Sequence, residues 1–408
     1  MKLRDTFEET ATALSANKVR SGLTILGIVI GIASVIAMVS IGNGAQATIQ
    51  SSIESLGSNL LIVYPGATRT AGVSAGRGSS KTLTIEDAQA ITAQVAGISE
   101  VAEEVSGRYQ VTAKGTNTNT TVDGVSPTYA TIRNVSIDQG SFITASHAAA
   151  LSKVAVLGPT TVTDLFGDTA TAADAIGQSI RIKGQLFTVI GVTVAKGGSG
   201  FTNQDDMIYI PYTTAGRYFA GDAYLTSIDI QAADSADMTQ VQSDVTDLLL
   251  AQHHLADAAN ADFSILNQAD IISTASSVTG TFTLLLAAVA GISLVVGGIG
   301  IMNMMLTTVT ERTREIGLRK AVGASSSDIN RQFLLEALAL TMIGGVTGVI
   351  LGWLVSFGIS LTGLLSPQVS ISSILLAFGV SAAIGVGFGW YPARRAARMN
   401  PIDALRYE

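Results

Sequence analysis

The sequence predicts a membrane protein with four transmembrane α-helices and a large α+β extracytoplasmic domain inserted between the first and second helices. Three observations support this fold class: the chain has four long apolar runs, a polar stretch over residues 42–280 that contains no spanning segment, and Lys and Arg gathered in three places. The chain has 408 residues, no Cys and a formal net charge of −7. This charge argues against nucleic acid as a partner, because phosphate binding needs a basic field. The lack of Cys excludes disulfides and thiol catalysis.

Residues 1–20 predict a cytoplasmic amphipathic helix on the membrane surface, since sparse apolar positions alternate with Lys2, Arg4 and Arg20. Residues 21–41 are nearly all apolar and predict the first transmembrane helix. A cleaved signal peptide is the alternative. The apolar run is long for such a peptide and has no clear small-residue cleavage pattern, so an uncleaved span is the better interpretation.

Residues 42–280 predict a folded domain of alternating short strands and helices, arranged in two subdomains. Residues 59–64 resemble a buried strand, Thr84 and Asp87 form a capping pattern, and Gly184-Gln185 separates the strands of a hairpin. Residues 48–56 and 265–276 are expected to prolong the flanking spans as stalk helices. The glycine-rich residues 68–80 predict a mobile loop.

The rest of the chain alternates between spans and short connections. We expect a second span over residues 281–307, a cytoplasmic coupling segment over 308–332, a third span over 333–360, an outer loop over 361–370, a fourth span over 371–391, and a cytoplasmic tail over 392–408. Small residues that let helices approach closely mark the first and third spans, namely Gly27, Gly31, Gly344, Gly348 and Gly352.

Orientation follows from the Lys and Arg residues, which concentrate at the N-terminus, in residues 311–331 and in the tail. The positive-inside rule therefore places both termini and the 311–331 segment in the cytoplasm of a multi-pass protein of the inner, or cytoplasmic, membrane. Residues 42–280 then face outward.

The charged segment begins at Glu311 and has the sequence Glu-Arg-Thr-Arg-Glu-Ile-Gly-Leu-Arg-Lys-Ala-Val-Gly-Ala. Charges of opposite sign stand three or four residues apart in the pairs Glu311/Arg314, Arg312/Glu315 and Glu315/Arg319, which predicts an exposed helix. Gly323 is placed to end this helix, and Ser325 with Asp328 forms a capping box for the next one.

Four stretches of the chain resemble the MacB/FtsX family of ABC-transporter permeases. They start at Asn17 (NKVRSGLTILGIVIGIA), Ser55 (SLGSNLLIVYPG), Val309 (VTERTREIGLRKAVGA, which contains the charged segment) and Gly389 (GWYPARRAARMNPIDALRY). The resemblance implies that the charged segment is a coupling helix that docks into a groove of an ATPase. It assigns ATPase coupling to Glu311, Arg312, Arg314, Glu315, Ile316, Gly317, Arg319, Lys320 and Gly323.

The resemblance further implies a MacB-type permease subunit that carries mechanical motion from a separate ABC ATPase subunit to the extracytoplasmic domain. Its expected partners are that subunit, a second copy of the chain in a homodimer, a membrane-fusion adaptor protein and membrane lipid. ATP and Mg²⁺ would be bound by the partner subunit, with no cofactor in this chain. The expected role is efflux of peptides, antibiotics or other toxic compounds. A lipoprotein-releasing permease, a cell-division permease and a non-transporting receptor are the alternatives.

No residue pattern in the chain predicts an enzyme. The nearest approach to a phosphate-binding loop, Gly76 to Thr82, lacks the Gly before Lys81. The neighbouring carboxylates Glu103/Glu104 and Asp205/Asp206 have no acid–base partner in sequence, so we expect solvated faces there. Glu336 lies one turn inside the third span, and we expect it to pair with Arg331, Arg319 or a basic residue of the tail rather than to bind a proton or substrate.

Overall fold

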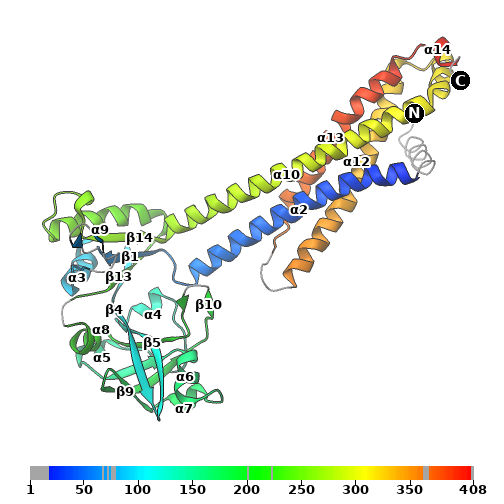
Figure 1. Cartoon of the computed structure of the whole chain (residues 1–408). Helices are drawn as coiled ribbons and strands as arrows, with labels where there is room; N and C mark the ends of the chain where they lie inside the picture. The colour runs from blue at the N-terminus through cyan, green and yellow to red at the C-terminus, as the bar shows by residue number, and fades with distance from the viewer. Residues whose placement is uncertain are drawn as a thin grey trace. The chain divides into compact units, whose positions relative to one another are not determined.

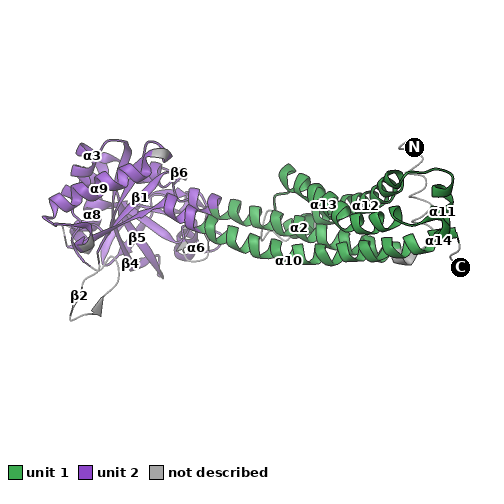
Figure 2. Cartoon of the chain, turned by 90° about the horizontal axis from the view of Figure 1, so that it is seen from above, with its two compact units in different colours: residues 1–49, 275–408 green, residues 50–274 purple. Residues whose placement is uncertain are grey.

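The computed structural model describes residues 18–66, 69–70, 73–74, 80–199, 202–221, 224–361 and 367–405 (Figure 1). These residues fall into two compact units, one built from residues 1–49 and 275–408 and the other from residues 50–274 (Figure 2). The amphipathic helix expected over residues 1–20 lies outside the described residues except for its last three positions. Most of the glycine-rich segment 68–80, most of the turn before Pro367 and the end of the tail also lie outside them.

Among the described residues, four helices are long and apolar enough to cross a membrane. These helices are α2 (Lys18–Glu54), α10 (Gln268–Glu311), α12 (Ser326–Ser360) and α13 (Ile371–Ala397). Two short helices accompany them, α11 (Thr313–Ala321) and α14 (Pro401–Leu405). The stalk helix expected from residue 265 in fact begins at Gln268. Ile265 and Leu266 are paired instead with Val63 and Ile62 of a neighbouring strand, so the chain is still extended there.

Glycines bring the helices of the first unit together. A Cβ atom added to Gly348 would lie 2.9 Å from Cβ of Ile32, and α12 repeats this contact one turn away on either side. The glycines of the α12 stripe are Gly344, Gly348 and Gly352, and they face Ile28, Ile32 and Ile36 of α2. Gly27 and Gly31 of α2 are placed against α10, at Gly297 and Leu294. Close backbone approach of this kind favours helix association in a membrane.

One mixed sheet of ten strands runs through the second unit in the order β14-β1-β13-β4-β5-β12-β7-β9-β6, with β8 beside β4 and β9. The strands are β1 (Leu60–Pro65), β4 (Ile98–Ala113), β5 (Thr116–Val125), β6 (Ile137–Gly140), β7 (Val154–Leu157), β8 (Ser179–Ile182), β9 (Gln185–Thr193), β12 (Met207–Pro211), β13 (Ser227–Ala232) and β14 (Phe263–Asn267). The sequence predicted two subdomains, whereas these ten strands form one continuous sheet.

Short elements complete the second unit. Its helices are α3 (Ile85–Gln94), α4 (Tyr129–Ile132), α5 (Ala145–Ala149), α6 (Pro159–Phe166), α7 (Ala172–Ala175), α8 (Tyr212–Ala215) and α9 (Met238–Gln252). Two small ribbons pair β2 (Arg69–Thr70) with β3 (Val73–Ser74) and β10 (Gly198–Ser199) with β11 (Thr202–Asn203). The predicted hairpin is present between β8 and β9, but its turn lies one residue earlier than predicted, at Lys183 and Gly184, which both have positive φ. Two positive φ angles in succession match the right-handed twist of the flanking strands.

The two faces of the sheet carry different side chains, because successive residues of a strand point to opposite faces. Leu61 and Val63 of β1 belong to the larger hydrophobic core, which α3, α6 and α9 also enter. Leu60 and Ile62 belong to a smaller core on the other face, together with Tyr129 of α4. This second face is covered by fewer helical residues, and its ionisable groups become important below.

Candidate functional site

The charged segment folds as the short helix α11 between two long ones. Helix α10 ends at Glu311, and Arg312, with φ −101° and ψ 17°, interrupts the helical backbone before α11 begins. Gly323 has φ +107° and ends the turn after α11, a conformation that glycine adopts without steric penalty. The predicted capping box is confirmed, since Ser325 and Asp328 exchange side-chain and backbone hydrogen bonds at the start of α12. The sequence therefore fixes both ends of the connection.

The inner side of α11 is attached to the C-terminal part of the chain. Ile316 is 2% exposed, and a Cβ atom on Gly317 would lie 2.8 Å from Cβ of Ala404 in α14. Lys320 Nζ donates hydrogen bonds to the carbonyl oxygens of Ala397 (2.6 Å) and Met399 (2.8 Å). A cation at carbonyl groups that end a helix is favourable, because these oxygens lack partners within the helix. Ile316, Gly317 and Lys320 therefore position α11 rather than face outward.

The ion pairs of α11 attach it to α12 as well. Arg319 Nη2 lies 2.8 Å from Glu315 Oε1, while Arg319 Nη1 donates to Gln332 Oε1 at 2.8 Å. Arg312 lies 3.8 Å from Glu315 and 3.6 Å from Glu336, measured between side-chain N and O atoms. Two of the predicted helical pairs thus form, and Glu336 pairs with an arginine. That arginine, Arg312, was not among the partners the sequence analysis proposed.

The outer side of α11 carries two apolar residues that sequence reasoning did not single out. Leu318 is 58% exposed and Val322 is 83% exposed, and they lie four positions apart. Arg314, one turn before Leu318, is also exposed, as are Glu311, Glu315 and Gly323. Residues three or four apart share one face of a helix. Leu318 and Val322 therefore form an apolar pair, and the charged Arg314 lies on the same face one turn before Leu318. We call these three residues the outer face of α11.

The signal for the outer face is present in the sequence, but it is ambiguous there. Ile316 and Leu318 are both single apolar residues in a charged helix of nine residues. Only packing in the folded chain decides that Ile316 is buried in the hydrophobic core of the first unit while Leu318 is exposed. A short helix has too few turns for the period of its apolar positions to distinguish one side from the other.

Family models match most of the chain. The MacB-like periplasmic core domain matches residues 21–248, and the FtsX-like permease C-terminal region matches residues 287–401, which include α11. The chain belongs to the MacB/FtsX family of ABC-transporter permeases. With its four span-forming helices, this MacB-type chain is a membrane protein that carries a MacB-like extracytoplasmic domain.

Relatives of this MacB-type chain are named for macrolide export. The macrolide export ATP-binding/permease protein MacB of Bdellovibrio bacteriovorus is 43% identical over 398 residues, which cover 97% of this chain and 60% of that protein. The protein of the same name from Azoarcus sp. is 42% identical over 411 residues, covering 100% of this chain and 60% of that protein. The chain thus spans about 60% of the length of these curated relatives. The periplasmic region of MacB from Actinobacillus actinomycetemcomitans is 21% identical, with a TM-score of 0.46 over 56% of this chain and 97% of that one.

Other candidate groups in the MacB-type chain have structural partners. His253 Nδ1 lies 2.7 Å from Asp262 Oδ1 and its Nε2 lies 3.3 Å from Asp87 Oδ2, so this ring joins α9 to α3. Burial lowers the pKa of His253, but the hydrogen bonds and negative charges of Asp262 and Asp87 outweigh this effect, so the pKa is raised overall. In the described part of the chain, no cluster of three or more His, Cys, Asp or Glu residues could hold a metal ion.

The expectation that Glu104 and Asp206 lie on solvated faces is wrong. Both residues line a cavity over the less covered face of the sheet. Glu103 and Glu104 are successive residues of β4 and therefore point to opposite faces. Two adjacent glutamates thus lie in different environments, because successive side chains of a strand point to opposite faces of the sheet.

Proposed function

We propose that this chain is the permease of an ABC transporter and receives ATP-driven motion at the outer face of α11. The observation that carries the proposal is the contrast between the two sides of this helix. Its inner side is bonded to the end of α13 and to α12, whereas Leu318 and Val322 are exposed at its outer side. An ATPase subunit that binds ATP and Mg²⁺ would cover this apolar pair. Motion of α11 would then reach α12 and α13 through the Lys320 and Arg319 hydrogen bonds.

The proposed topology places α11 and both termini in the cytoplasm and residues 50–274 outside. Lys and Arg at the N-terminus, in α11 and in the tail support this orientation in the cytoplasmic membrane. Helices α2 and α10 have 37 and 44 residues, which correspond to about 55 and 66 Å at the rise of an α-helix. Both exceed the roughly 30 Å of hydrocarbon in a bilayer. Each helix therefore has length to continue beyond the membrane toward the sheet.

A single side chain joins the ends of these two helices within the second unit. Gln268 Nε2 donates to the carbonyl oxygens of Ile53 (2.8 Å) and Gly57 (2.6 Å), and Gln268 Oε1 accepts the Leu60 N–H (3.0 Å). Gln268 is the first residue of α10, whereas Ile53 is near the end of α2. We name this contact the Gln268 joint. In the proposed mechanism, the Gln268 joint makes the end of α2 and the start of α10 move together.

The proposed cargo is a peptide, an antibiotic or another toxic compound, exported by a homodimer of this chain with its ATPase and a membrane-fusion adaptor. The names of the relatives, which describe macrolide export, support this class. Substrate would be handled by the extracytoplasmic domain. The candidate spans support this because their apolar windows contain at most two charged residues.

The outer face is tested by ATPase stimulation in proteoliposomes that hold this chain with its ATPase subunit. We expect the double variant Leu318→Ala/Val322→Ala to lower stimulation at least about tenfold, because alanine removes most of the apolar area that would be covered on docking. Leu186→Ala is the matched control, since this leucine is 54% exposed on β9 of the other unit. Full stimulation in the double variant, with normal membrane insertion, would contradict the proposal.

A further inference from the structure

A cavity of about 770 Å³ lies over the less covered face of the sheet in the second unit. Strands β1, β4, β5 and β12 contribute to its floor, through the lining residues Ile62, Glu104, Asp123 and Tyr209. Helix α4 and the residue after it, Arg133, form part of its wall. A volume of this size falls within the range of sites for small organic molecules, about 300–1,000 Å³.

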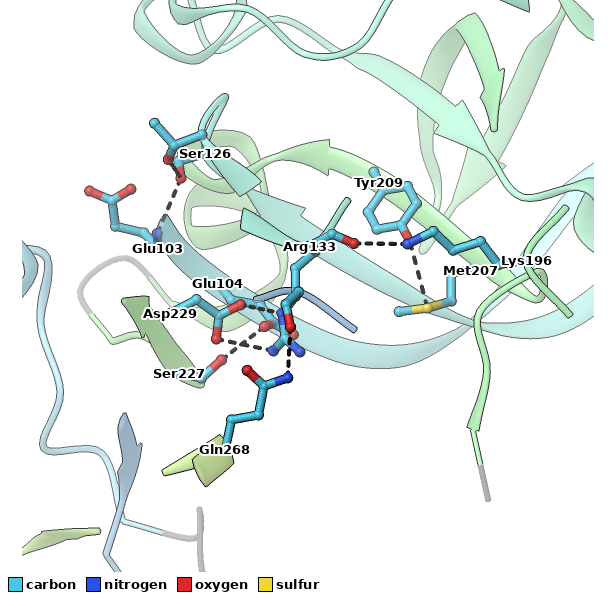
Figure 3. Close-up of polar contacts among 12 residues, drawn as sticks. Glu103, Glu104, Ser126, Arg133, Lys196, Met207, Tyr209, Ser227, Asp229 and Gln268 are labelled. Carbon is cyan, nitrogen blue, oxygen red and sulfur yellow. Dashed lines mark hydrogen bonds and ion pairs between the residues drawn. The ribbon is translucent and has the colours of Figure 1, made fainter. Parts of the chain in front are cut away.

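The cationic groups at this cavity are already engaged. Arg133 Nε and Nη2 bond both carboxylate oxygens of Asp229, at 2.6 and 3.1 Å, and the Asp229 side chain is fully buried (Figure 3). Lys196 Nζ donates to the carbonyl oxygens of Arg133 and Ser55. Arg108, an exposed residue of the lining, donates to the carbonyl oxygen of Asn119. Arg133 and Asp229 therefore neutralise each other within the wall.

Two carboxylates of the lining are left without a cation. Ser227 Oγ donates to Glu104 Oε2 at 2.9 Å, and Ser106 Oγ donates to Asp123 Oδ1 (Figure 3 shows the Glu104 contact). Asp123 is 1% exposed and its Oδ2 atom has no hydrogen-bond partner. Neither Glu104 nor Asp123 forms an ion pair with another described residue. A buried carboxylate oxygen without a donor is unfavourable, which indicates that a donor belongs in this position.

Asp206 adds a third acidic group at the same cavity, and its Oδ1 atom is also buried without a hydrogen-bond partner. These three acids do not form a metal site, since no cluster of metal-ligating side chains exists among the described residues. Aromatic rings and aliphatic side chains surround them instead. Tyr129 and Tyr209 lie with ring centroids 5.8 Å apart, and Tyr64 also lines the cavity. Tyrosine faces attract cations and accommodate apolar groups.

We propose that this cavity binds a small organic cation with an apolar body, whose ammonium group donates hydrogen bonds to Asp123 and Glu104. The apolar body would lie against the tyrosine rings. The proposal goes beyond the coupling role of α11, because it requires neither ATP nor a partner subunit.

Acidity should control this binding. Burial raises the pKa of Glu104 to about 8 and that of Asp123 to about 6, and the nearby Arg133 guanidinium only partly opposes the rise. Burial also raises the pKa of Asp229, against the effect of its bond with Arg133. An ammonium group favours the ionised carboxylates, so binding releases a proton and becomes tighter as the pH rises toward 8.

The test uses the full chain in detergent micelles and isothermal titration calorimetry with 2-phenylethylammonium. The neutral 2-phenylethanol, of similar shape, is the matched probe. We expect the cation to bind at least about tenfold more tightly at pH 8.5 than at pH 6, as the titration of one raised carboxyl group requires. We expect the alcohol to bind at least about tenfold more weakly than the cation at pH 8.5.

Two variants decide whether the carboxylates carry the binding. Asp123→Asn and Glu104→Gln should each weaken binding of the cation at least tenfold, while Asp138→Asn, which changes an exposed acid of β6, should leave it unchanged. Neutralising a carboxylate that has no cationic partner should leave the Tm equal or higher, so lost binding would not reflect unfolding. Equal binding of cation and alcohol, undiminished binding in both carboxylate variants, or no measurable binding to the wild-type chain would overturn the proposal.

Discussion

The two units of the chain use charged groups in opposite ways. In the first unit, charges lie at the edge of an interior built from glycine and isoleucine contacts, and Glu315 is 46% exposed in its pairs with Arg312 and Arg319. In the second unit, the fully buried Asp229 side chain pairs with Arg133 inside the domain. Exposed ion pairs contribute about 0–1 kcal/mol, whereas breaking a buried pair costs several times more. The difference teaches that a single ion pair of α11 can be broken at low cost, whereas the Arg133–Asp229 pair is costly to break.

The buried pair gives the largest expected effect. Arg133→Met should lower the free energy of unfolding by about 3–5 kcal/mol, because it leaves the Asp229 carboxylate buried without its cation. Chemical denaturation of the full chain in micelles measures this change, with the far-ultraviolet circular dichroism of the β-sheet as the signal. Arg133→Met combined with Asp229→Asn should recover part of the loss. A loss below about 1 kcal/mol in the single variant would show that the pair resembles the exposed pairs of α11.

The glycine contacts of the first unit give the next effect. Gly348→Ala should destabilise the helix bundle by about 1–3 kcal/mol, since the new Cβ would lie 2.9 Å from Ile32 and 3.1 Å from the carbonyl oxygen of Val29. Gly358→Ala, in the same helix, is the control, because a Cβ there meets no atom within 4 Å. Thermal unfolding in micelles compares the two. Equal Tm values would mean that α2 and α12 separate easily at this position.

A further expected effect is a pH dependence that the cavity confers on the second unit, spread over several pH units. The folded-state pKa of Glu104 is raised from 4.5 to about 8, so the folded state holds a proton that the unfolded state has lost between these values. Stability should therefore fall as the pH rises through this window, by at most about 1.4 kcal/mol per pH unit from this group. Glu104→Gln should flatten the profile of Tm against pH. A wild-type profile that rises between pH 5 and 8, with no change in the variant, would contradict a protonated Glu104.

Much of the fold follows from local sequence patterns. The four apolar runs, the capping box at Ser325 and the positive-φ turn at Lys183-Gly184 all depend on residues close in sequence, and the structure has each of them. The beginning of α10 was misplaced, because Ile265 and Leu266 become a strand only by pairing with β1, about 200 residues earlier in the chain. Local propensity does not report such distant pairing.

The candidate sites were less predictable for the same reason. The charges of α11 were visible as helical pairs, but which of its apolar residues is buried depends on how the helix packs in the first unit. Likewise, Glu104 is half-buried in a cavity that α4 and Arg133 also line, and no neighbour in sequence indicates this. Sequence patterns identified the ionisable residues. Tertiary packing alone determines which of these residues are exposed to solvent.

The Gln268 joint is made by a side chain that does not titrate, which affects how the joint responds to pH. A carboxamide does not titrate in the physiological pH range, so the three hydrogen bonds of Gln268 to Ile53, Gly57 and Leu60 do not depend on the protonation of nearby acids. An ionised glutamate in its place would offer no N–H to the two carbonyl oxygens. The contact between α2, α10 and β1 is therefore insensitive to a change of pH around the second unit.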